Sequence, residues 1–217
     1  MKIYLPCSKL VKGINVQWLH MNYLVGLGNP GEKYANSRHN VGFMMLEACI
    51  IHFGLPQPHD SKQYAGRVSE GMIHEEEVAC LFPDTFMNHS GTAVAKLVPK
   101  AKVAELVVLY DDVDLALGEV KVSFGRGDGG HNGIKSIIES LGTKDFVRVR
   151  IGVAQKTVWP WEKGDVRRPK GEKMGNFVLA NFTKKERQEL DALAPKVADI
   201  IGALVVEGKE AAMNRFN

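Results

Sequence analysis

The chain has 217 residues, of which 45% are hydrophobic and 24% are charged, so a globular core is expected and a disordered or fibrous chain is excluded. The formal net charge of +3 does not by itself indicate a nucleic-acid partner, although segregated charges could still form a basic surface. Three widely spaced cysteines without a C-x-x-C pair argue against disulfides and a cysteine zinc site, and favour a reducing cytoplasm.

The first twenty residues, MKIYLPCSKLVKGINVQWLH, differ from the rest of the chain. They contain no continuous apolar run, which argues against a secretory signal, and no arginine, which argues against a transit peptide. Met21 stands just before the first apolar strand pattern. We therefore expect residues 1–20 to be an N-terminal extension, disordered or not native, and residues 21–217 to be one catalytic domain.

The first half of the chain alternates expected strands and helices. Short apolar runs predict strands, and apolar residues at helical spacing predict helices. The expected elements are a strand over residues 23–27, a helix over 41–53, a hairpin of 64–73 and 77–82, a helix after Asn88 and a buried strand over 106–110.

The second half continues this alternation. The expected elements are a strand over residues 119–124, a glycine-rich turn, a helix over 134–141, a strand over 146–153, a long mobile loop over 155–175, a helix from Thr183 with a capping-box Glu186, and a short last helix after Gly208. Pro195 is expected to kink or split the helix that begins at Thr183. The pattern predicts an α/β fold, a single three-layer domain with a mixed, mostly parallel central sheet flanked by helices.

The loop after the first strand, GLGNPG at residues 26–31, matches the G-x-G-x-x-G pattern of dinucleotide-binding folds. Such folds also need a second strand that ends in an acidic residue about 20 residues further on, to hold the ribose hydroxyls. Here that region is the end of the expected helix at His52, Phe53 and Gly54. The glycine pattern alone is therefore weak support for a dinucleotide site.

Three asparagines stand in short distinctive contexts: Asn29 in GNPG, Asn88 in FMNHSG and Asn132 in GGHNG. Each one alone is most simply a turn or helix-cap residue. Together with His39 and the acidic run after the buried strand, they suggest a site in which amides fix a water molecule and polarise a carbonyl group.

Asp111 is the first residue beyond the expected strand and is therefore best placed to face this site, whereas Asp112 is expected in a solvated turn. A carboxylate at Asp111 could orient His39 as a general base, because the ordinary histidine pKa of ~6.5 lies near the operating pH. His131 is the alternative base, and it could equally cap the helix that follows it.

These motifs, taken together, resemble the bacterial-type peptidyl-tRNA hydrolases over residues 23–217. In order they are VGLGNPG (25–31), Tyr34, RHN (38–40), FMN with SG (86–91), Asp111 with Asp114 and Leu115, GGHNG (129–133), RVRIG (148–152) and AMNRF (212–216). So many separate matches in the right order make chance implausible.

The resemblance implies a cytoplasmic monomer that hydrolyses the ester between a peptide and the 3′ ribose of tRNA, recycling tRNA without a metal, another cofactor or a membrane. His39 would be the general base, Asp111 would orient it, and the three asparagines would hold the ester, its carbonyl and the attacking water. Further substrate contacts are expected at these positions, the last two of them facing tRNA phosphate: Tyr34, Phe86, Met87, His131, Lys121 and Arg150.

Three features depart from the family pattern, namely Asp128 in the glycine-rich turn, Ser123 in place of a lysine, and the long loop over residues 155–175. They bear on tRNA affinity more than on catalysis. The alternative function is that of a non-catalytic RNA-binding relative, such as the plant organellar splicing factors. A binding module would have no reason to retain the complete set of His39, Asp111 and asparagines.

Overall fold

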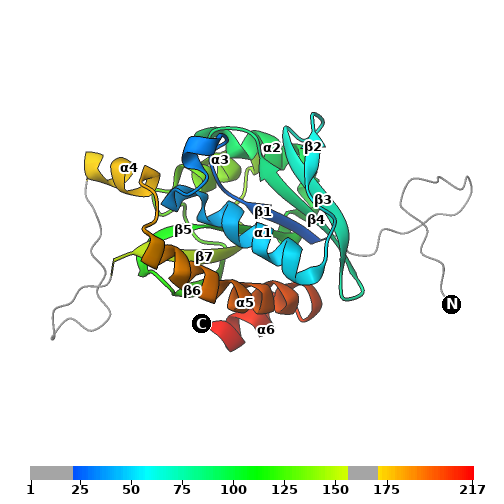
Figure 1. The fold of residues 1–217 in the computed structure, drawn as a ribbon. Coiled ribbons are helices and arrows are strands. Elements are labelled where there is room, and N and C mark those ends of the chain that lie inside the picture. The colour runs from blue at the N-terminus through cyan, green and yellow to red at the C-terminus, as the bar shows by residue number, and fades with distance from the viewer. Residues whose placement is uncertain (1–21, 156–170) are drawn as a thin grey trace, which may run out of the picture.

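One seven-stranded sheet organises the molecule. The structure, a computed structural model, describes residues 22–155 and 171–217. The strands are β1 (Asn22–Gly26), β2 (His59–Ser61), β3 (Gly66–Ile73), β4 (Glu76–Pro83), β5 (Leu106–Ala116), β6 (Val120–Phe124) and β7 (Val147–Ala154). Their order is β2-β3-β4-β1-β5-β7-β6 (Figure 1). The central strands β4, β1, β5 and β7 pair in parallel, and the outer pairs are antiparallel. The predicted mixed sheet with a parallel centre is confirmed.

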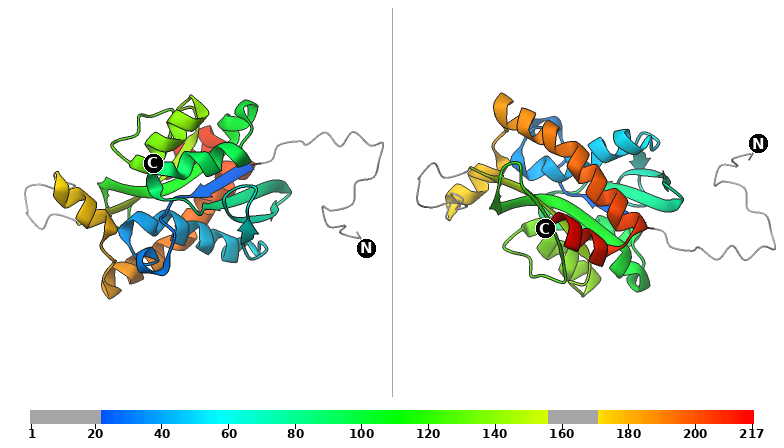
Figure 2. Two further views of the ribbon diagram at one scale, coloured as in Figure 1. Left: turned by 90° about the horizontal axis from the view of Figure 1, so that it is seen from above. Right: turned by 90° about the horizontal axis from the view of Figure 1, so that it is seen from below.

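Helices cover both faces of this sheet, so the molecule has three layers (Figure 2). The helices are α1 (Val41–Phe53), α2 (Ser90–Leu97), α3 (Asn132–Leu141), α4 (Glu172–Leu179), α5 (Lys184–Val206) and α6 (Lys209–Phe216), with short 3-10 turns η1 (Glu32–Tyr34), η2 (Arg38–Asn40), η3 (Met87–His89) and η4 (Lys100–Glu105). Helices α1 and α5 pack on one face, and α2 and α3 pack on the other. Helix α6 packs against α5 and β6.

Alternate residues of each central strand enter two separate cores. In β5, Val107 and Leu109 pack with α1 and α5, whereas Leu106, Val108 and Tyr110 pack with α2 and α3. Successive side chains of a strand point to opposite faces, so a strand covered on both sides must be apolar at every position. This explains the unbroken apolar run that begins β5.

Two glycines let α1 approach the sheet closely. A Cβ atom on Gly42 would lie 2.3 Å from the carbonyl oxygen of Leu109, and a Cβ atom on Gly26 would lie 2.6 Å from the carbonyl oxygen of Gly42. The first glycine of the G-x-G-x-x-G pattern therefore allows strand and helix backbones to touch. This contact fixes the start of α1, and with it the turn η2 that carries His39.

Several expected elements differ from the observed ones. Strand β5 runs on to Ala116 because its pairing with β7 continues through Asp111 and Asp112, so the predicted strand end at residue 110 is wrong. The short edge strand β2 was not predicted. Helix α4 begins inside the expected loop, and α5 continues through Pro195 without a split.

Two expectations concern parts of the chain outside the described residues. These are the N-terminal extension and residues 156–170 of the long loop. Within the described ranges, no helix combines the length and the hydropathy that crossing a bilayer requires.

Candidate active site

A cavity of about 410 Å³ lies between β5, the glycine-rich turn before α3, and α4. His39 on η2 and Asp111 on β5 face it, as do His131 and Asn132 at the start of α3. In sheets with a parallel centre, ligands bind in crevices near strand ends, where loops from neighbouring strands meet. The cavity therefore gathers residues that lie far apart in the sequence.

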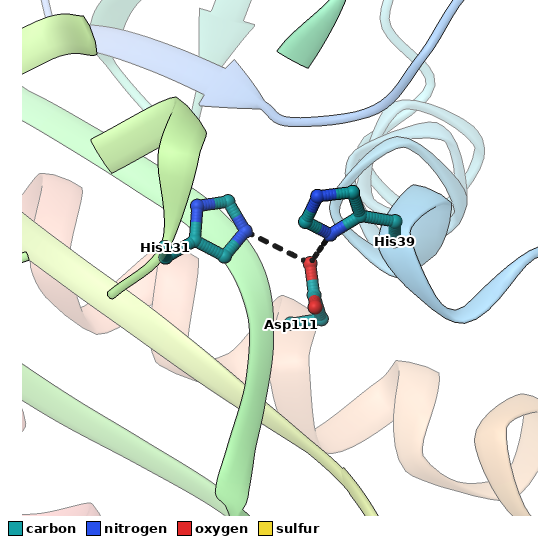
Figure 3. Close-up of side chains that lie close together, drawn as sticks. All are labelled: His39, Asp111 and His131. Atoms are coloured by element: carbon teal, nitrogen blue, oxygen red, sulfur yellow. Dashed lines mark hydrogen bonds and ion pairs between the residues drawn. The ribbon is translucent and has the colours of Figure 1, made fainter. Parts of the chain in front are cut away.

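One carboxylate oxygen of Asp111 receives hydrogen bonds from two histidines (Figure 3). Oδ1 of Asp111 lies 2.8 Å from Nδ1 of His39 and 3.0 Å from Nε2 of His131. All three side chains are at least nine-tenths buried. Because β5 extends further than expected, the carboxylate is mounted on a paired strand instead of a turn, which restricts its orientation.

The hydrogen bonds of His131 fix which of its ring nitrogens carries the proton. Nδ1 of His131 accepts from the backbone N–H groups of Gly133 at 3.1 Å and Ile134 at 3.2 Å, and so caps α3. The proton must then be on Nε2, which donates to Asp111. Both nitrogens of His131 are occupied by protein partners.

In His39, by contrast, only one ring nitrogen is bound by the described part of the protein. Its Nδ1 donates to Asp111, and within the described residues its Nε2 has no hydrogen-bond partner. Burial lowers the pKa of His39, but the charge of Asp111 and the hydrogen bond that His39 donates to it outweigh burial and leave this pKa above its ordinary value. Nε2 of His39 is therefore the ring nitrogen of this pair that can accept a proton from a water molecule.

The charge of Asp111 is stable at neutral pH. Burial raises the pKa of this carboxyl group, but His39 and His131 oppose burial and hold the pKa well below its usual range. The three possible ligand atoms lie within 4.8 Å of one another, which is compact enough to consider a metal. The two histidine N–H groups directed at one carboxylate oxygen account for this arrangement as hydrogen bonds. A metal bound here would require both of these ring nitrogens to give up their protons.

Asn29 is buried and its orientation is determined by hydrogen bonds to the protein. Its side-chain Oδ1 accepts from the backbone N–H of Met87 at 2.8 Å. Its own backbone N–H and C=O each bind the side chain of Asn40 at 2.9 Å. The network joins the glycine loop to the turn of His39 and leaves the side-chain NH₂ group of Asn29 as its remaining donor.

The other two predicted asparagines are exposed. Asn132 begins α3 and lines the cavity beside His39. Asn88 lies in η3, where its Nδ2 is 3.2 Å from Nε2 of His89. Of the three, only Asn132 borders the cavity itself.

The predicted apolar contacts separate into exposed and buried positions. The side chain of Phe86 is 57% exposed, whereas Met87 beside it is buried in the core between the sheet and α2 and α3. Tyr34 is half-buried in η1, with Nζ of Lys33 at 4.6 Å from its ring centre. Phe86 and Tyr34 are thus accessible to a ligand.

The two predicted basic contacts lie opposite each other on neighbouring strands β6 and β7. Lys121 is exposed, but Nε of Arg150 donates to Oδ2 of Asp112 at 2.7 Å. Asp112 is buried, and its Oδ1 accepts from the backbone N–H of Asp114. The expectation that Asp112 lies in a solvated turn is wrong, because β5 continues past it and Arg150 covers it.

Two residues of the cavity wall, Arg148 and Asp128, have structural roles that were not predicted from the sequence. Arg148 is fully buried and donates to the backbone carbonyls of Arg126 and Gly127, which shapes the glycine-rich turn. Asp128 also supports this turn, with Oδ1 accepting from the N–H of Gly130 at 2.7 Å. The R-V-R pattern of β7 was a usable signal, because residues two apart in a strand share one face. Both arginines therefore lie on the face of the sheet opposite Val147, Val149 and Ile151, which pack with α1 and α5.

A histidine oriented by a buried carboxylate beside an open cavity is the arrangement of a hydrolase that uses a general base. The family model described as peptidyl-tRNA hydrolase matches residues 23–217. A peptidyl-tRNA hydrolase of Mycobacterium marinum is 40% identical over 198 residues, covering 89% of this chain and 96% of that protein. One of Thermodesulfovibrio yellowstonii is 36% identical over 201 residues, covering 91% and 99%.

Solved structures agree with this result. The crystal structure of peptidyl-tRNA hydrolase from Acinetobacter baumannii has a TM-score of 0.76 and 30% identity, covering 91% of this chain and 94% of that one. The chain belongs to the peptidyl-tRNA hydrolase family.

Proposed function

We propose that this protein hydrolyses the ester between a peptide and the 3′ ribose of tRNA, and that His39 is its general base. One observation carries the assignment of the base. Asp111 occupies Nδ1 of His39, and Nε2 has no partner in the described part of the chain, whereas His131 has both ring nitrogens engaged. Family membership supports the substrate, and it does not support the alternative of a non-catalytic RNA-binding protein.

In the first step, Nε2 of His39 takes a proton from a water molecule as its oxygen attacks the ester carbonyl carbon. Asp111 stabilises the imidazolium that forms, because its carboxylate already binds the opposite nitrogen. The tetrahedral oxyanion then collapses and the bond to the ribose 3′ oxygen breaks. The proton on His39 passes to this oxygen, which leaves as a hydroxyl group, and the peptide leaves as a carboxylic acid.

The asparagines supply neutral donors and acceptors around the reacting carbonyl. Asn132 borders the cavity and would hold the attacking water or the carbonyl oxygen. The remaining NH₂ donor of Asn29 would bind the substrate's terminal ester, and Asn88 would contact the oxyanion. An amide suits these roles because it does not titrate between the ground state and the transition state.

Recognition of the two substrate ends would use different surfaces. Phe86 is exposed and would contact the peptide, and Tyr34, half-buried near the glycine loop, is a further substrate contact. Lys121 and Arg150 would contact tRNA phosphate, where positive charge gives affinity without sequence readout. We further propose that the protein acts as a monomer in the cytoplasm and needs no metal.

The test is to incubate the protein with a peptidyl-tRNA and with an aminoacyl-tRNA that has a free amine, in the presence of a chelator. We expect cleavage of the first substrate, little cleavage of the second, and a loss of about 10³-fold in His39→Ala. Binding of tRNA without any cleavage would favour the RNA-binding alternative. Unchanged turnover in His39→Ala would assign the base role to another residue.

A further inference from the structure

We infer that Arg38 is a positioning residue, which holds helix α4 in place as a wall of the His39 cavity through its ion pair with Glu186. The inference rests on the proposed function, because it concerns substrate binding in the same cavity. Arg38 itself does not line the cavity. Its effect on the reaction must therefore pass through the elements that it binds.

The side chain of Arg38 is almost completely engaged by the segment that joins α4 to α5. The residue is only 5% exposed. One terminal nitrogen donates to the carbonyls of Ala180 at 3.2 Å and Asn181 at 3.0 Å. The other donates to both carboxylate oxygens of Glu186, at 2.8 and 3.0 Å.

Two aromatic rings and a short backbone pairing add to these contacts of Arg38, and the whole set is called the clamp below. The guanidinium lies 4.7 Å from the ring centre of Phe177 and 5.3 Å from that of Phe182. The backbone N–H of Arg38 donates to Ala180, and that of Phe182 donates to Asn36. The end of α4 is thus attached directly to the residues that precede His39.

Within the described residues, the main element in contact with helix α4 is η2, which carries Arg38. It lies at the outer side of the molecule, away from both helical layers (Figure 1). Met174, Gly175 and Val178 of α4 nevertheless form part of the cavity wall. A helix held mainly at its C-terminal end can keep these residues in position only while that end is fixed.

The charge of Glu186 is central to this clamp. Burial raises the pKa of Glu186, but hydrogen bonds from Thr183 and Arg38 outweigh burial and leave it lowered, so the group is ionised at neutral pH. Nε of Arg38 is buried and has no hydrogen-bond partner among the residues that the structure describes. Removing the carboxylate would leave a buried guanidinium without its counter-charge, which is strongly unfavourable. The segment after α4 is expected to move away in response.

The test uses Glu186→Gln, which removes the charge but keeps a residue that can complete the capping box of α5. We expect KM for peptidyl-tRNA to rise about tenfold, equivalent to about 1.4 kcal/mol, with kcat within about twofold of the wild type. The acid limb of the pH profile should not move, because the His39–Asp111 pair is untouched. Amide hydrogen exchange in residues 173–179 should become faster.

Thr183→Ala is the matched control, because it removes the capping hydroxyl of α5 and leaves the Arg38–Glu186 pair intact. It should lower thermal stability without changing KM. Wild-type KM and wild-type exchange in Glu186→Gln would overturn the inference, as would an equal rise in KM in Thr183→Ala. If the wild type cleaves no peptidyl-tRNA, the proposed function fails, and the exchange measurement still tests the clamp.

Discussion

Replacing Asp111 by asparagine tests the electrostatic role of the carboxylate with little change in shape. In the wild type, Oδ1 of Asp111 accepts from Nδ1 of His39 and from Nε2 of His131. The charge of Asp111 raises the pKa of His39 against the effect of burial. Without this charge, burial dominates and the pKa of His39 falls. The acid limb of the rate profile should therefore move to lower pH.

The rate at the plateau should fall as well. His131 donates to Asp111 both before and during the reaction, so only the bond from His39 strengthens when the imidazolium forms. A hydrogen bond to a charged group contributes about 1.5–3 kcal/mol, and each 1.36 kcal/mol of barrier is tenfold in rate. The expected loss is about 10- to 150-fold.

The assay is single-turnover hydrolysis of a peptidyl-tRNA from about pH 5 to about pH 9. Asp112→Asn serves as the control, because this neighbouring carboxylate faces Arg150 instead of His39. The control should leave the acid limb where it is in the wild type. An unchanged plateau in Asp111→Asn, or an acid limb that moves to higher pH, would refute the role given to the carboxylate.

Substitutions at three further positions test other parts of the structure. His131→Ala should lower the free energy of unfolding by about 1 kcal/mol in urea titrations, because α3 loses its cap. His131→Asn should restore a helix cap. Both variants should keep more activity than His39→Ala. Lys121→Ala should reduce the slope of log KM against log salt concentration by about 0.7–0.9 if this side chain contacts one phosphate. Gly42→Ala should lower the free energy of unfolding by about 3 kcal/mol or more in the same titrations, because its Cβ atom would lie 2.3 Å from the carbonyl oxygen of Leu109.

The parts of the fold that follow local rules were predictable. Helix α1 begins and ends where its apolar spacing and Gly54 indicated, and the capping box of Thr183 and Glu186 forms as expected. The central strands were recognisable because burial on both faces requires apolar residues at every position. These features depend on residues that are near one another in the sequence.

The errors occurred where distant contacts decide the structure. Nothing near Asp112 in the sequence indicates that β7 supplies Arg150 to cover it, so the polar run looked like a turn. Helix α4 is short, and the residue after it binds Arg38, which lies more than a hundred residues earlier.

The candidate site shows the same division. The sequence indicated His39 and Asp111, but left two roles open for His131. The choice between them depends on backbone N–H groups that only the folded chain brings to Nδ1 of His131. Likewise, the side-chain oxygen of Asn29 is fixed by the backbone of Met87, a contact that no spacing in the sequence reveals.

The most direct test of the role of His39 is to compare two titrations. NMR would measure the pKa of the His39 imidazole in the free protein, and the acid limb of kcat/KM would give the pKa of the group that must be unprotonated. The two values should agree and should both lie above the ordinary value of ~6.5. An acid limb that follows a different group would contradict the assignment of His39 as the base, and a His39 pKa below that value would contradict the raising effect given to Asp111.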